Sequence, residues 1–344
     1  MNALVPLVVL IPLLSAAAAL VFGRSRTAQR VIAIAALAAV FLIGSALVVL
    51  VDSGPLVMEV GGWQAPFGIV LVVDRLSALM VAVSALVLLA VLIFSVGQGL
   101  ADGDDETPVS IFFPTYLILG AGVFTAFIAG DLFNLYVGFE ILLVASYVLM
   151  TLGGTTERIR AGTTYIVVSL VSSVLFLASI AMIYAAVGTV NIPQISLRMR
   201  EIPMDVQIIL HAMLLTAFGI KAAIFPLSFW LPDSYPTAPA PVTAVFAGLL
   251  TKVGVYAIIR TETLIFPGSE LNPWLMGIAL ATLVVGVLGA VAQADIKRML
   301  SFTLVSHIGY MVLGVALGSV LGTAATIYYI VHHIVVQATL FLTT

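Results

Sequence analysis

A few ionisable side chains stand inside long apolar stretches of this sequence. They are Glu140, Lys221, Lys252, His307 and the adjacent pair His332 and His333. A lysine or carboxylate at the centre of a membrane helix costs about 2.5–3.5 kcal/mol on insertion scales. Such residues normally face the interior of a helix bundle or a water-filled cavity, where they carry ions or protons. The set therefore predicts an ion or proton path through apolar surroundings.

The two lysines and the glutamate also have structural interpretations. Glu140 and Lys221 could form an ion pair that holds two helices together, although desolvation offsets much of the attraction in such a pair. Lys252 could extend along its helix so that its ammonium reaches the nearer membrane surface. These interpretations stay open at the level of sequence.

The histidines are weaker signals. His307 could be a hydrogen-bonded packing residue rather than a proton relay. His332 and His333 point about 100° apart on a helix, so we expect only one of them to face a polar interior. His211 lies near the end of an apolar run and could be an interfacial residue.

The stretch after Lys221 is rich in proline. Residues 225–244 read FPLSFWLPDSYPTAPAPVTA and begin with Phe225 and Pro226. Pro226 has no N–H and crowds the carbonyl of Ala222, so it should break the helix and free a carbonyl beside Lys221. Transporters use such breaks to build ion sites, whereas interfacial loops are also proline-rich. The proline cluster indicates a transport site because it directly follows a buried lysine.

The composition places these residues in a membrane. The 344 residues are 62% hydrophobic and 8% charged, with a mean hydropathy of +1.24, whereas soluble domains are about 45–50% apolar and about 25% charged. A net charge of −3 offers no basic surface for nucleic acid. The absence of cysteine excludes disulfides, zinc thiolates, iron–sulfur clusters and thioether-linked haem. We expect an integral membrane protein in the lipid bilayer, without a cofactor or a nucleic-acid partner.

Uncharged apolar runs of about 20 residues define the expected transmembrane helices. Eleven such runs predict an all-α polytopic membrane protein. They are residues 3–22, 30–51, 76–99, 112–129, 131–153, 161–187, 206–226, 240–259, 272–293, 298–319 and 322–342. No Lys or Arg precedes the first run, so it should be a retained helix rather than a cleavable signal.

The distribution of Lys and Arg predicts the orientation. With the N-terminus outside, the inside loops hold seven of these cations and the outside loops hold four, of which Arg260 is one. Cytoplasmic loops carry the excess of Lys and Arg. We therefore place the N-terminus and the loop at 188–205 outside, and the loops at 24–30 and 154–160 inside. The acidic loop at 100–111 also falls inside.

Three segments resemble the antiporter-like subunits shared by Mrp-type cation/proton antiporters and respiratory complex I. They are DLFNLYVGFEILLVASYVLM at 131–150, GIKAAIFPLSFWLPDSYPTAPAPVTAVFAGLLTKVGVYAIIR at 219–260, and DIKRMLSFTLVSHIGYM at 295–311. The NLYVGFE form of the first segment looks most like the D-type subunit of Mrp complexes. The resemblance covers essentially the whole chain.

The resemblance implies roles for individual residues. Glu140 matches the glutamate of the fifth span, and Lys221 matches the lysine beside the break in the seventh. Lys252 matches the lysine of the eighth span, which leads toward the protein centre. His332 or His333 matches the histidine position of the eleventh span.

The resemblance also implies the domain organisation. The family has fourteen spans, with two inverted five-helix repeats at its core. We expect an N-terminal three-helix segment at 1–110, a first repeat with the broken helix at 111–260, and the start of a second, incomplete repeat at 261–344. The chain stops at the end of the eleventh span, so it appears truncated relative to the family. Gln337 stands where several relatives have a lysine.

The implied function is exchange of Na⁺, or alternatively K⁺, for H⁺ by a transporter subunit that is not an enzyme. It would act with other membrane subunits in the plasma membrane of a prokaryote. Glu140 would stabilise the charged form of Lys221, and the released proton would pass by water or histidine, with His307 on the route, to Lys252 and the histidines of the eleventh span. Sodium needs oxygen ligands, and the sequence points to no particular set.

Three alternatives stay open. The chain could be a proton-pumping subunit of complex I or of a membrane-bound hydrogenase, although the Mrp-like form of the segment at 131–150 argues against this. It could be a non-transporting structural subunit, which would tolerate neutralisation of Glu140 or Lys221. It could also be an independent uniporter or channel, which would work without partners.

Overall fold

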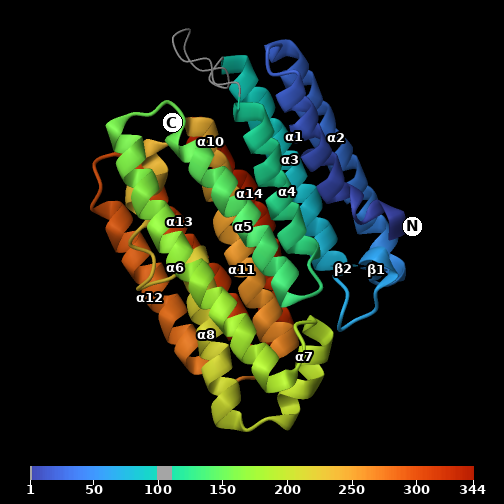
Figure 1. The fold of residues 1–344 in the computed structure, drawn as a ribbon. Coiled ribbons are helices and arrows are strands. Elements are labelled where there is room, and N and C mark those ends of the chain that lie inside the picture. Colours follow the sequence, from blue (N-terminus) through green and yellow to red (C-terminus); the bar gives the residue numbers. More distant parts are fainter. Residues whose placement is uncertain (1, 99–110) are drawn as a thin grey trace.

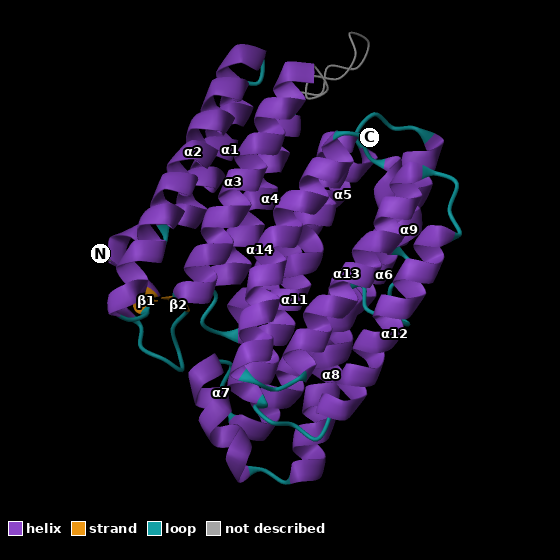
Figure 2. Cartoon of the chain, turned by 180° about the vertical axis from the view of Figure 1, so that it is seen from behind, coloured by secondary structure: helices purple, strands orange, loops and turns teal. Residues whose placement is uncertain are grey.

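The structure is a computed structural model that describes residues 2–98 and 111–344. Helices make up nearly all of it (Figures 1 and 2). In these two ranges the only strands are β1 (Leu56–Glu59) and β2 (Val70–Val73), which form a small antiparallel hairpin. The predicted all-α fold class is confirmed. Apart from Ile111, the predicted acidic loop at 100–111 lies outside the described residues.

The helices follow one another in an up-and-down order. The long ones are α1 (Leu7–Val21), α2 (Arg26–Leu50), α3 (Arg75–Gln98), α4 (Phe112–Ile128), α5 (Leu132–Thr151), α6 (Thr156–Val187), α8 (Met204–Ala222), α12 (Asn272–Val291), α13 (Ile296–Ala316) and α14 (Val320–Leu342). Shorter ones are α7 (Ile192–Arg198), α9 (Leu231–Ser234), α10 (Ala240–Val245) and α11 (Thr251–Arg260). Two π-helical segments, Phe246–Leu250 and Thr261–Ile265, flank α11.

The helices coincide with the predicted spans. Nine helical segments of the described ranges are long and apolar enough to cross a membrane. The apolar helices α1 and α4, of 15 and 17 residues, occupy the other two predicted positions. One of the nine is a continuous helix from Ala240 to Ile265, and every residue of its most apolar stretch is buried. This central helix, which contains α11, is therefore surrounded by protein rather than by lipid.

Side-chain caps begin several of the spans. Asp131 accepts a hydrogen bond from the N–H of Asn134 at 2.6 Å and starts α5. Thr155, Asp295 and Ser319 cap α6, α13 and α14 in the same way. A side-chain oxygen at this position satisfies an N–H that the helix itself leaves free. Each cap therefore fixes the residue at which its helix begins after the preceding loop.

The break in the seventh span begins earlier than the sequence predicts. Helix α8 ends at Ala222, and Ala223 adopts the left-handed region with φ 60°. Trp230 Nε1–H donates to the Ile220 carbonyl at 3.2 Å across the break. The predicted break around Pro226 is confirmed, and the helix itself ends four residues before this proline because Ala223 turns into the left-handed region.

The two ends of the bundle carry different elements. Helix α7 and the β1–β2 hairpin lie toward the lower end in Figure 1, and the C-terminus lies at the upper end. Helix α7 forms in the predicted loop at 188–205, where Asn191 caps it through the N–H of Gln194 at 3.3 Å. The predicted division into segments 1–110, 111–260 and 261–344 stays a prediction.

Candidate functional site

Lys221 lies in the last turn of α8, directly before the break. Its ammonium donates to the Ser173 hydroxyl at 2.9 Å and to the Ser169 carbonyl at 3.4 Å, both on α6. The same nitrogen lies 5.5 Å from the centroid of the Phe139 ring on α5, where a cation is attracted to the ring face. Polar atoms of α6 and an aromatic ring of α5 thus hold Lys221 inside the protein.

Glu140 follows Phe139 on α5 but does not touch Lys221. Its Oε1 atom is buried and has no hydrogen-bond partner. The ion pairs within 4.0 Å in the described ranges do not include Glu140. Glu140 is nevertheless the next residue after Phe139, whose ring centroid lies 5.5 Å from the Lys221 nitrogen. The structure therefore brings the two groups to one site without joining them, and the direct ion pair of the structural interpretation is not formed.

A small cavity lies beside Lys221. It has a volume of about 20 Å³, and its lining includes Tyr165, Tyr235 and Leu250. A space of this size holds about one water molecule. Leu250 belongs to the π-helical segment that leads to Lys252, so the cavity lies between the break in α8 and the central helix.

Lys252 is completely buried in the central helix. Its ammonium donates to the Ala247 carbonyl at 2.5 Å, within the π-helical segment before α11. The side chain thus turns back along the helix, and the interpretation in which it reaches the membrane surface is wrong. π-helical turns inside α-helices occur frequently at functional sites.

Helices α8 and α11 touch at Gly254. A Cβ at this position would lie 2.6 Å from the Ala222 backbone nitrogen, closer than real Cβ contacts. Only a glycine therefore lets α11 pack against the last turn of α8. This contact sets the spacing between the backbones that carry Lys221 and Lys252.

We expect Gly254→Ala to slow ion exchange several-fold in the assembled complex. The added methyl must push the end of α8 away from α11, and overpacking of this kind costs about 1–3 kcal/mol. Gly277→Ala on α12 is the matched control, since a Cβ there meets no atom within 4 Å. Exchange rates in proteoliposomes, at equal amounts of assembled complex, measure the effect. Equal rates for the two variants would show that the spacing does not matter.

His307 and His333 form a second cluster near Lys252. Their rings lie 4.8 Å apart, and His307 Nδ1 is hydrogen-bonded to the Tyr329 hydroxyl. His333 is buried, and neither of its ring nitrogens has a hydrogen-bond partner. The π-helical segment that leads to Lys252 packs against α14 next to His333, since a Cβ at Gly248 would lie 3.4 Å from the Ile334 carbonyl oxygen. The structure therefore places the segment that carries Lys252 beside this histidine cluster.

His332 lies at the edge of this cluster, with its ring centroid 6.1 Å from that of Tyr329. Its side chain is exposed on the surface of the helix bundle, while His333 is 1% exposed. The expectation that only one of the two adjacent histidines faces the interior is confirmed. Gln337, one turn further on, is buried and donates to the Leu300 carbonyl at 3.2 Å.

The serines of α6 were missed by the sequence analysis. Ser169, Ser172 and Ser173 are all buried, and the Ser172 hydroxyl donates to the Ala217 carbonyl of α8 at 2.8 Å. Hydroxyl groups three and four residues apart share one helix face. That spacing inside an apolar run is the signal that could have identified them as the polar partners of Lys221.

Arg260 also has a role that the sequence did not predict. Counted there as an outside loop residue, it is the last residue of α11 and forms paired hydrogen bonds of 2.6 Å with both Asp74 oxygens. Burial raises the pKa of the Asp74 carboxyl, but the hydrogen bonds and charge of Arg260, with help from Ser77, lower it overall to about 2. The loop assignment of Arg260 is wrong because the helix continues past it to Ile265, and Asp74 pairs with its charge there.

The described part of the chain holds no transition-metal site beside these residues. Within residues 2–98 and 111–344, no three His, Cys, Asp or Glu side chains gather closely enough to hold a metal ion. The clustered groups are lysine, histidine, tyrosine and serine, which can pass protons among themselves and through water. The arrangement is suited to proton movement.

Comparison with known proteins agrees with this picture. The family described as NADH:quinone oxidoreductase/Mrp antiporter, transmembrane, matches residues 129–344. The D-type subunit of the Na⁺/H⁺ antiporter of Alkalihalophilus pseudofirmus is 43% identical over 347 residues, which is 99% of this chain and 69% of that protein. The D-type subunit of the Na⁺/H⁺ antiporter of Bacillus subtilis is 38% identical over 349 residues, with the same coverage of 99% and 69%.

Two solved structures share the fold. A chain of the Mrp complex from Dietzia sp. superposes with a TM-score of 0.92 and 36% identity, over 99% of this chain and 64% of that one. A chain of the membrane-bound sulfane sulfur reductase, an archaeal respiratory complex, gives a TM-score of 0.92 and 29% identity, over 99% and 70%. The present chain thus spans about two thirds of the length of its relatives.

The fold and the placement of Lys221 and Lys252 define a multi-pass membrane subunit of the antiporter-like class, with a broken helix beside the first of these lysines. Within that class, the chain belongs to the family of D-type subunits of the Mrp-type multisubunit cation/proton antiporters.

Proposed function

We propose that this chain moves protons in exchange for Na⁺, or alternatively K⁺, as one membrane subunit of a larger complex. It is a transporter subunit rather than an enzyme, and it lies in the plasma membrane of a prokaryote with its N-terminus outside. The observation that carries this proposal is the placement of Lys221 and Lys252. Both are held inside the protein without an adjacent carboxylate, on helices that touch at Gly254.

The proposed proton route follows the contacts. An ammonium in apolar surroundings is costly, so the distance of the Glu140 carboxylate governs whether Lys221 keeps its proton. The cavity next to Lys221 provides a place for one water molecule on the way to the central helix. From Lys252 the proton passes to His307 and His333, whose rings lie side by side. Ser173 holds the Lys221 ammonium in place between transfers.

A second candidate is proton pumping in a redox-driven complex. The likeness to a chain of the archaeal sulfane sulfur reductase complex favours it. The higher identity to the D-type antiporter subunits, 43% against 29%, favours exchange. The structural alternative loses its main support because Glu140 and Lys221 form no ion pair.

Reconstitution tests the proposed function directly. We expect the complete complex in liposomes to acidify or alkalinise the lumen when a Na⁺ gradient is applied, with a pH-sensitive dye as the readout. The purified chain alone should show no Na⁺-driven proton movement, because the route needs partner subunits. Robust exchange by the chain alone would establish an independent transporter instead. Proton movement that requires an electron donor would establish the redox candidate.

Cysteine labelling tests the orientation. The chain has no cysteine of its own, so a single introduced cysteine reports its own position. We expect Ser25→Cys, between α1 and α2, to react only with reagent inside the cell. Glu201→Cys, between α7 and α8, should react only with reagent outside. Both positions are exposed, and labelling of both from the same side would contradict the span map.

A further inference from the structure

Glu262 is a nearly buried carboxylate that the proton route does not use. It lies in the π-helical segment after α11 and is 7% exposed. In the described ranges, the only other carboxylate residue as deeply buried is Asp131, which caps α5. Glu262 lines the same cavity as Ser319, the residue that caps the start of α14, so it lies near the end of that helix opposite the C-terminus.

His211 of α8 fixes the Glu262 carboxylate. His211 Nε2 lies 2.5 Å from Glu262 Oε1, and Nδ1 lies 2.8 Å from the Ser269 hydroxyl oxygen. The imidazole stacks on the Phe266 ring with centroids 4.4 Å apart and is fully buried. The carboxylate therefore has one rigid orientation.

Ser269 holds the other ring nitrogen of His211. The Ser269 oxygen accepts from the N–H of Leu271 at 3.2 Å and lies 2.8 Å from His211 Nδ1. His211 Nε2 contacts only Oε1 of Glu262, so it occupies one of the two carboxylate oxygens.

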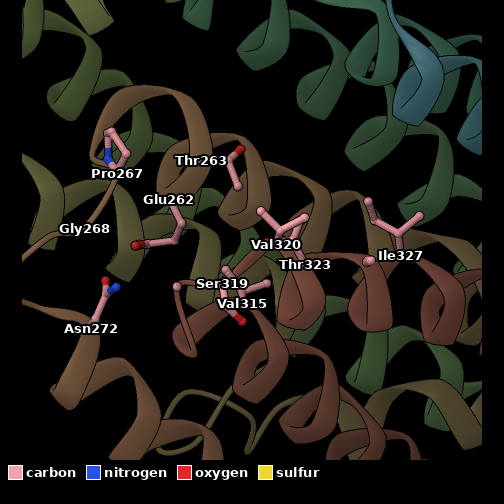
Figure 3. A pocket seen from close by; sticks show the side chains of 12 residues that line it. Glu262, Thr263, Pro267, Gly268, Asn272, Val315, Ser319, Val320, Thr323 and Ile327 are labelled. Atoms are coloured by element: carbon pink, nitrogen blue, oxygen red, sulfur yellow. The ribbon is translucent and has the colours of Figure 1, made fainter.

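A cavity opens next to this carboxylate. Its volume is about 470 Å³, and its polar lining comprises Glu262, Thr263, Asn272, Ser319 and Thr323. Figure 3 shows the Glu262 carboxylate and the Asn272 amide turned toward the same space. The Asn272 Oδ1 atom is buried and has no hydrogen-bond partner. About 10–15 Å³ of this kind of volume is enough for one water molecule, so the cavity has room for an ion together with several waters.

The chemistry of this lining suits a hard monovalent cation. Hard cations bind carboxylate, amide and water oxygens, and neither Lys nor Arg lines the cavity. A single carboxylate supplies one negative charge, and divalent sites of high affinity need more. Glu262 would supply the charge, Asn272 a free carbonyl oxygen, and water the remaining ligands.

We propose that this cavity binds a partly hydrated Na⁺ ion between Glu262 and Asn272, as the place where the cation enters the protein. The inference rests on the proposed function, because it assigns a site to the exchanged cation. It separates the cation from the lysines and histidines of the proton route, which would repel it when charged.

Protection of a reporter cysteine tests this site without relying on transport. Thr323→Cys, on the α14 side of the cavity, is introduced into the chain of the complete complex, and its rate of modification by a maleimide is measured. We expect NaCl to slow modification at least about tenfold relative to choline chloride at equal ionic strength, a difference that corresponds to about 1.4 kcal/mol. Glu262→Gln in the same background should abolish the protection.

A matched substitution controls for the loss of charge. Glu270→Gln removes an exposed carboxylate of the same loop and should leave the protection intact. Equal slowing by Na⁺ and choline, or full protection in the Glu262→Gln complex, would overturn the site. If Glu262→Gln prevents assembly, Asn272→Ala replaces it, and undiminished protection in that variant overturns the site in the same way.

Exchange measured on the same preparations keeps the two proposals apart. Na⁺-driven proton movement by the wild-type complex without Na⁺ protection refutes the cation site and leaves the proposed function standing. Na⁺ protection without any proton movement supports the cation site and refutes the proposed function.

Discussion

Replacement of Lys221 by arginine is expected to abolish Na⁺-dependent proton exchange in an assembled complex. The guanidinium can keep a hydrogen bond to Ser173 and a position over the Phe139 ring, but it does not release its proton at working pH. Removal of a group that gives and takes protons lowers rates by about 100-fold or more. The measurement is proton uptake into proteoliposomes under a Na⁺ gradient, normalised to assembled complex.

Lys297→Arg is the matched control for this substitution. Lys297 lies near the start of α13, outside the membrane core, so its replacement makes the same chemical change without touching the site. This variant should retain near-normal exchange. Glu140→Asp should be milder than Glu140→Ala, because it keeps the charge and shortens the reach. Near-normal exchange by Lys221→Arg would assign Lys221 a structural role, since arginine binds hydroxyls and carboxylates at least as well as lysine.

His333 and His332 should respond oppositely to the same substitution. We expect His333→Gln to reduce exchange by about 100-fold, because His333 is buried against His307 and beside the segment that carries Lys252. His332→Gln should change the rate less than about threefold, within the context dependence of a surface position. The two residues are neighbours in the chain, so expression and helix propensity are matched. The readout is again Na⁺-driven proton uptake.

The opposite pattern of rates for these two variants would contradict the proposed route. Loss of exchange in His332→Gln with normal exchange in His333→Gln would place the route on the exposed face of α14. The buried cluster with His307 would then serve packing alone. Comparable losses in both variants would indicate that the helix, rather than one imidazole, is being tested.

The transmembrane helices were predictable from the sequence because each needs a continuous run of about 20 mostly apolar residues. The same logic located Lys221 and Lys252, since a charge inside an apolar run is visible without any tertiary knowledge. It failed at Arg260, because a charge at the end of a run looks identical whether it faces water or a carboxylate. Asp74 stands 186 residues earlier in the chain, and no local pattern links the two.

The polar partners of the site were not predictable for the same reason. Ser173 contacts Lys221 across 48 residues, and Glu262 contacts His211 across 51. Serine is compatible with a membrane helix on any face, so its presence in α6 does not reveal what it binds. The break position also depended on the backbone: Ala223 takes a left-handed conformation that is uncommon for a residue with a Cβ.

The paired hydrogen bonds between Arg260 and Asp74 attach the central helix to the residue that precedes α3. Arg260 also donates to the Tyr256 hydroxyl at 2.9 Å, and that hydroxyl donates to the Phe127 carbonyl at 2.7 Å, so α3 and α4 anchor the same end. At 1.5 Å per residue, Lys252 lies about 12 Å from Arg260 along the helix axis. The Lys252 ammonium and the π-helical turn before it therefore lie about two helical turns from this attachment, within the buried central helix. The N-terminal part of the chain is thus tied directly to the helix that carries Lys252, although the two are far apart in sequence.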